Sequence, residues 1–226
     1  VRSLALAIKN RVLDALAFDT APKATPDKQL AVAKFGEQCA SCHGSTGGGD
    51  GPASAGMTPP PRNFRDVDVL SVSSPFKYYN ASVLGIEGTT MVSFAQSLSD
   101  QERWSLAFYA MGMSRSEPTD DPETIWKAVP TGTRETLLKG GLSLALLARK
   151  SDAELREWIK SLKGIAASDL DSTLTVLRTA APFVKTLPRT AAIAQESPNT
   201  QTPPQALDST QFTEAIAKLR AQFEKA

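Results

Sequence analysis

The stretch QCASCHGSTGGGDGP, residues 38–52, holds both cysteines of the chain and its only histidine. The three side chains fall within five consecutive positions, as Cys39, Cys42 and His43. The residues before them have helical spacing, and a glycine-rich loop follows. Two thiols and an imidazole gathered in so few positions indicate one site that uses all three.

The spacing Cys-x-x-Cys-His is that of a c-type haem attachment site. Two thioethers must reach the two vinyl groups of one porphyrin, and the adjacent imidazole must reach the iron from the same side. We therefore expect Cys39 and Cys42 to bind one haem c covalently. His43 is then expected to be an axial ligand of the haem iron.

Three other interpretations of the motif are weaker. A structural zinc site needs four ligands, and the chain has only three Cys and His residues. A thioredoxin-like dithiol follows a strand, whereas Ala31 and Phe35 belong to a predicted helix. An inert pair of buried cysteines is the plain alternative.

The second axial ligand cannot be histidine, and methionine is the usual alternative in electron carriers. The chain has four methionines, Met57, Met91, Met111 and Met113. Met111 and Met113 end a predicted helix, where a core role is ordinary, and Met57 precedes a stiff run of prolines. Met91 follows the loop GIEGTT, which leaves enough chain to return on the far face of a haem. We predict Met91, with a vacant or lysine-ligated sixth position as the alternative.

Composition excludes several classes of protein. The 226 residues contain 25 Lys and Arg against 24 Asp and Glu. A balance this even argues against a nucleic-acid binder and against a basic membrane-surface protein. No apolar run approaches the ~18 residues of a transmembrane helix. Because the sequence starts at Val1, a mature form or an excised fragment is expected.

The pattern along the chain predicts an all-α protein, since no alternating run calls for a sheet. Proline-rich and polar stretches divide it into segments. We expect an N-terminal helix and connector (1–22), a haem domain (23–117), a helical segment (118–187), and a polar linker with a terminal helix (188–226).

Two long stretches together resemble a known family. LAVAKFGEQCASCHGSTGGGDGP and GTTMVSFAQSLSDQERWSLAFYAMGM, with PPPRNF between them, look like a class I cytochrome c. The combination of GDGPASAGMTPPPRNF with GTTMVSFAQSLSDQERWSLAFY most resembles the cytochrome c domain fused ahead of bacterial Ftr-type iron permeases. The strong resemblance covers about residues 28–113. Two positions depart from the family, which usually has proline at the place of Val92 and often has glycine at the place of Ala31.

The resemblance implies helices packed around a covalently bound haem, with loops carrying Pro52 and Met91 on opposite sides. In this family a carbonyl of the proline loop accepts the hydrogen bond of the ligand histidine, so Pro52 or Pro61 is expected to orient His43. Arg62 and Arg65 are expected to pair with haem propionates, or else to be solvated loop arginines.

The implied function is one-electron transfer by a haem protein that is not itself an enzyme. The expected partners are a redox protein or ferrous iron, and an iron permease membrane domain in the same polypeptide. The expected location is the periplasm, with a tether to the inner membrane. A generic carrier module of a periplasmic dehydrogenase or reductase, and a haem-based sensor, are the alternatives.

Overall fold

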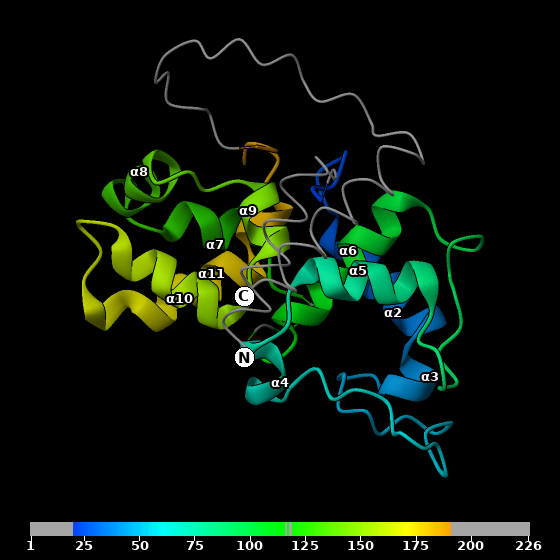
Figure 1. Cartoon of the computed structure of the whole chain (residues 1–226). Helices are drawn as coiled ribbons and strands as arrows, with labels where there is room; N and C mark the ends of the chain where they lie inside the picture. Colours follow the sequence, from blue (N-terminus) through cyan, green and yellow to red (C-terminus); the bar gives the residue numbers. More distant parts are fainter. Residues whose placement is uncertain (1–19, 116, 118, 191–226) are drawn as a thin grey trace, which may run out of the picture. The chain divides into compact units, whose positions relative to one another are not determined.

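The computed structural model describes residues 20–115, 117 and 119–190, which belong to one compact unit, Thr20–Ile193. The helices expected near both ends of the chain lie outside the described residues. Within the described part the protein is helical and has no strand, so the all-α prediction is confirmed. Figure 1 shows the arrangement of its helices.

The first half of the described chain holds five α-helices. They are α2 (Lys28–Gln38), α3 (Ala40–His43), α4 (Val67–Ser71), α5 (Pro75–Leu84) and α6 (Asp100–Gly112). Side chains before several of them accept hydrogen bonds from the free N–H groups of the first turn, which fixes where each helix begins. Asp27 caps α2, Ser74 caps α5, and Ser99 forms a capping box with Glu102 at the start of α6.

The second half of the described chain is helical as well. It contains α7 (Pro122–Ala128), α8 (Thr131–Lys139), α9 (Leu144–Arg149), α10 (Asp152–Ser161) and α11 (Leu170–Thr179), with short 3₁₀ turns at Ala167–Asp169 and Ala181–Phe183. The capping box that Ser151 and Glu154 predict at the start of α10 is confirmed.

Helix α6 is the centre of the unit. Every residue from Trp104 to Gly112 is buried, although an ordinary surface helix buries only one stripe. The reason is that α2 and α5 pack on α6, and α11 packs on it as well. One continuous hydrophobic cluster therefore includes Phe35 and Phe108 as well as Trp126, Leu155 and Leu177. The boundary predicted near residue 117 falls inside this single packed unit.

Candidate functional site

The two cysteines lie where one short helix meets another. Cys39 is both the C-cap of α2 and the N-cap of α3, and its N–H donates to the carbonyl of Phe35. Both thiols are free and half-buried, and burial raises the pKa of Cys39 to about 11. Cys42 and His43 lie in the single turn of α3, so the three side chains come from one compact piece of backbone.

The glycine-rich loop after His43 folds back under α3. The N–H groups of Gly49 and Gly51 donate to the carbonyls of His43 and Cys42, which the short helix leaves free. Gly49 has a φ of +80°, and a Cβ atom there would lie 2.6 Å from the carbonyl oxygen of Pro61. The loop needs glycine at this position because residue 61 approaches its backbone so closely.

His43 is held in the form that binds a metal. Its Nδ1 atom lies 3.0 Å from the carbonyl oxygen of Arg62. A carbonyl can only accept, so Nδ1 carries the proton and Nε2 keeps its lone pair. Burial lowers the pKa of His43, against the opposing effect of that hydrogen bond, and this favours the neutral ring.

The prediction that Pro52 or Pro61 supplies this carbonyl is wrong, because the acceptor belongs to Arg62. Pro61 directs its carbonyl toward Gly49 instead, and Pro52 is exposed beyond the turn at Gly51. Sequence reasoning missed the acceptor because a backbone carbonyl carries no residue-specific signal.

An aromatic cluster supports the histidine from one side. The ring of Phe64 stacks on His43, with centroids 4.5 Å apart and planes 19° apart. Phe35 and Tyr78 both meet Phe64 edge-on, at 6.3 and 5.4 Å. The backbone N–H of Phe64 donates to Gly47. The segment around residues 62–64 therefore holds His43 through both a hydrogen bond and a stacked ring.

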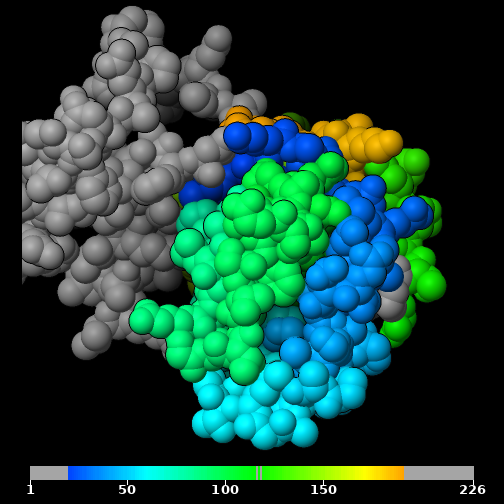
Figure 2. All heavy atoms as spheres, turned by 90° about the vertical axis from the view of Figure 1, so that its right-hand side faces the viewer, coloured from blue at the N-terminus to red at the C-terminus, as the bar shows by residue number. Residues whose placement is uncertain are grey.

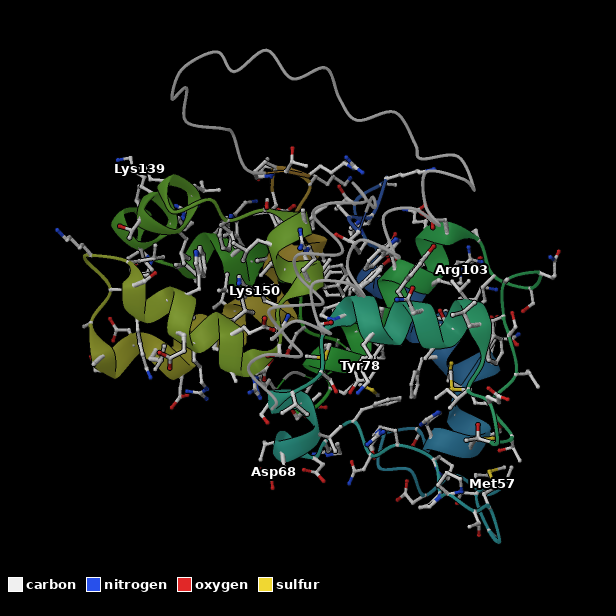
Figure 3. All side chains as sticks on the ribbon, viewed as in Figure 1. Met57, Asp68, Tyr78, Arg103, Lys139 and Lys150 are labelled. Carbon is white, nitrogen blue, oxygen red and sulfur yellow. The ribbon has the colours of Figure 1, made fainter. Side chains whose placement is uncertain are left out.

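The four methionines divide into two pairs. Met111 and Met113 are 0% and 8% exposed and belong to the core. Met57 and Met91 are half-buried in loops, and the hydroxyl of Thr90 donates to the sulfur of Met57 at 3.2 Å. Figure 3 labels Met57 in the loop after α3. Met91 as the axial ligand stays a prediction, with Met57 close by in space.

Apolar side chains stand exposed beside Met91. Leu84, Ile86 and Val92 are 76%, 46% and 65% exposed, and the N–H of Ile86 donates to the Met91 carbonyl, which closes the turn between them. In Figure 2 the segment from α2 to α3, the loop that follows it and the segment after α5 surround a hollow. An apolar macrocycle suits such surroundings.

Two further observations test whether a haem fits these residues. The hydroxyl of Tyr78 is buried and has no hydrogen-bond partner in the described part of the chain, and a haem brings two carboxylates that accept such bonds. Arg62 and Arg65 are exposed and pair with no carboxylate of the described residues. Their role toward haem propionates stays a prediction, and the residues present fit the group.

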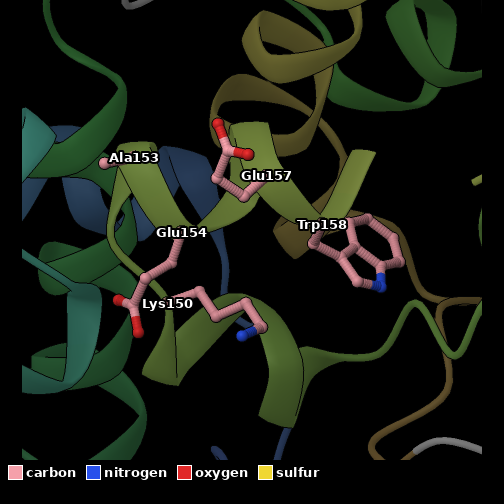
Figure 4. Close-up of a pocket in the computed structure, with 5 residues that line it drawn as sticks. All are labelled: Lys150, Ala153, Glu154, Glu157 and Trp158. Carbon is pink, nitrogen blue, oxygen red and sulfur yellow. The ribbon is translucent and has the colours of Figure 1, made fainter. Parts of the chain in front are cut away.

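A second hollow, of about 480 Å³, lies away from the cysteines, on α10 and the turn before it (Figure 4). Its two carboxylates are already used, because Glu154 accepts from the backbone N–H of Ser151 and Glu157 pairs with Lys160. No group of three or more His, Cys, Asp or Glu residues gathers as a metal site within the described ranges. None of the described helices is long and apolar enough to cross a membrane.

Comparison with known proteins gives the family of this site. Residues 29–114 match the family model of cytochrome c. A search of curated proteins found no match to the chain. Among solved structures, a chain of the Kuenenia stuttgartiensis reducing HAO-like protein complex Kustc0457/Kustc0458 is 33% identical, with a TM-score of 0.36. That match covers 42% of this chain and 49%, about half, of the other. Residues 29–114 are thus a cytochrome c domain, the kind of domain that binds one haem c covalently, and Cys39 and Cys42 fit its Cys-x-x-Cys-His attachment motif.

Proposed function

We propose that this cytochrome c domain passes single electrons in the periplasm as part of iron uptake by an Ftr-type iron permease. Electron transfer is what a cytochrome c domain implies. The link to iron rests on the resemblance of two stretches, one after the haem motif and one around Met91. The observation that carries the proposal is that Thr90 and Met57 are in contact. The two stretches on which the resemblance rests therefore build one face of the site.

The chain's own residues suit one-electron exchange. The haem, when bound, supplies an iron that changes between two oxidation states. His43 is kept neutral and oriented by the Arg62 carbonyl, so its Nε2 atom would be available to bind the iron. A methionine from the opposite loop would close the sixth position and disfavour binding of substrate to the metal. The apolar side chains around Met91 give an electron donor or acceptor a face with little charge to desolvate.

In this proposal Cys39, Cys42 and His43 would hold a haem that can accept one electron from ferrous iron, directly or through an oxidase partner, as iron enters the permease. The domain would be tethered at the inner membrane by the permease in the same polypeptide. The test is stopped-flow mixing of the full-length ferric protein with ferrous iron in the absence of oxygen. We expect ferrous iron to reduce the haem at least as fast as cells take up iron. We also expect iron uptake by cells to fall when Cys39 and Cys42 are both changed to Ala.

A matched control is a variant with Arg156→Gln, which removes a charge from the surface of α10 and leaves the haem site intact. Full iron uptake by the double cysteine variant, with the permease still present, would contradict the iron role. In that case the protein would be a general electron carrier. Tight carbon monoxide binding to the reduced wild-type protein would instead favour a haem sensor.

A further inference from the structure

A buried ionic cluster joins the cytochrome c domain to the helices that follow it. Asp152, at the start of α10, accepts from Arg115 just beyond α6 and from Arg178 on α11, each at 2.7 Å. Arg178 is 0% exposed and Asp152 is 4% exposed at the side chain, while Arg115 is 15% exposed. We call these three residues the junction cluster. Two guanidinium groups share one carboxylate, so the cluster carries one excess positive charge.

Arg178 is fixed in place by more than the ion pair. Its Nη1 and Nη2 atoms donate to the carbonyls of Leu147 and Lys150, at 3.2 and 2.6 Å. These carbonyls end α9, so the guanidinium also satisfies the acceptors that the end of that helix leaves free. Because these contacts fix the guanidinium group of Arg178, it does not reorient when nearby groups change charge.

Other charged groups near the cluster do not cancel its excess charge. Glu154 lies close enough to favour the charged form of Arg178. Glu154 is only half-buried and lines the surface hollow, and its carboxylate accepts from the backbone N–H of Ser151, whereas Asp152 is buried. Solvent screens Glu154 more than it screens the buried groups, so the three side chains of the junction cluster keep their excess positive charge.

The cluster is linked to the haem site through Tyr78, which Figure 3 labels on α5. Helix α5, which carries Tyr78, packs on α9, whose last carbonyls hold Arg178. The charges of Arg62, Asp152 and Arg178 all act on the pKa of the buried Tyr78 hydroxyl, which burial raises. Ser73 is a polar neighbour as well, although the two side chains do not reach the geometry of a hydrogen bond. The ring of Tyr78 meets Phe64, and Phe64 stacks on His43. Two aromatic rings thus separate the cluster from the axial histidine.

We infer that the junction cluster is an electrostatic part of the haem site and raises the reduction potential of the haem. A fixed positive charge disfavours the ferric state, which carries one more positive charge than the ferrous state. Because the cluster is buried, its effect passes through a region of low dielectric constant and is screened little by salt. Asp152 and Arg178 lie beyond the residues that match the cytochrome c model, so the following helices tune the site.

The test is optical redox titration of the full-chain holoprotein, which reads the potential directly and needs no partner. Arg115→Gln removes one positive charge and leaves Asp152 paired with Arg178, so the potential should fall. Asp152→Asn removes the negative charge, so the potential should rise. Opposite shifts from two residues that touch each other indicate a charge effect, since loosened packing would move both variants in one direction.

The matched control is Arg156→Gln, because Arg156 also pairs with one aspartate, Asp171, but at the surface of the same helix region. Its potential should stay at the wild-type value.

The shift of the Arg115→Gln variant should persist when ionic strength is raised from low to high, as expected for a buried charge. If Asp152→Asn does not fold, Arg115→Gln and its salt series decide the matter. An Arg115→Gln shift no larger than that of Arg156→Gln, or one that salt abolishes, would overturn the inference. The redox titration measures the haem of the purified protein, so its outcome does not depend on whether the protein takes part in iron uptake.

Discussion

At the scale of single residues, one hydrogen bond decides which nitrogen of His43 keeps a free lone pair. The Arg62 carbonyl accepts a hydrogen bond from the Nδ1–H group, and the stacked ring of Phe64 fixes the plane of the imidazole. No such contact distinguishes the two candidates for the methionine ligand, because Met57 and Met91 lie near each other in half-buried loops. The ligand assignment therefore needs a direct test.

We predict that Met91→Ala keeps the haem, because two thioethers hold it, but loses the weak near-red absorption of the ferric iron–sulfur bond. The reduction potential should also fall, because thioether ligation raises it. The measurements are absorption spectra and redox titration of the purified holoprotein. Met57→Ala should keep the band. A band that disappears in Met57→Ala while Met91 is intact would show that the ligand was assigned to the wrong methionine.

At the scale of elements, the buried helix α6 depends on close approach by α11. A Cβ atom at Gly112 would lie 3.1 Å from the carbonyl oxygen of Arg178 and 3.6 Å from the Cγ2 atom of Thr179. The same atom at Gly36, in helix α2, would meet nothing within 4 Å. Helix α11 therefore limits the space for a side chain at position 112, whereas position 36 has room for one, although both glycines lie in helices.

Gly36→Ala should stabilise the protein by about 0.5–1 kcal/mol, since alanine is the better helix former and nothing obstructs it. Gly112→Ala should gain less or nothing, and Gly112→Val should destabilise the protein by about 1–3 kcal/mol through overpacking against α11. Denaturant unfolding of the holoproteins measures all three. Equal changes in stability for the two alanine variants would mean that α11 does not pack closely on α6 in solution.

At the scale of the whole molecule, the cytochrome c domain and the helices after it share one core. Trp126 and Leu177 belong to the same hydrophobic cluster as Phe35 and Phe108. The buried ammonium group of Lys28 adds a second link, since it donates to the backbone carbonyls of Glu117 and Asp120. The helices beyond residue 117 thus cover a surface that a free-standing domain would expose.

A protein cut after residue 117 should therefore bind haem but be markedly less stable. We expect a lower melting temperature and stronger binding of a hydrophobic dye, because the face of α6 under α11 becomes exposed. Differential scanning calorimetry and dye fluorescence measure these changes against the full chain. A melting temperature equal to that of the full chain would show that the later helices pack on the domain without stabilising it.

The sequence alone determined the haem attachment motif, because the motif is defined by the short-range spacing of Cys39, Cys42 and His43. It also determined the helical class and the capping box at Ser151, since both follow from local patterns. The packing of distant segments, by contrast, was needed to show that Arg62 orients the histidine and that Phe64 stacks on it. It alone brought Arg115, Asp152 and Arg178 together across a boundary that proline and polar residues suggest. Backbone carbonyls and long-range ion pairs depend on how distant segments pack, and no local pattern encodes that.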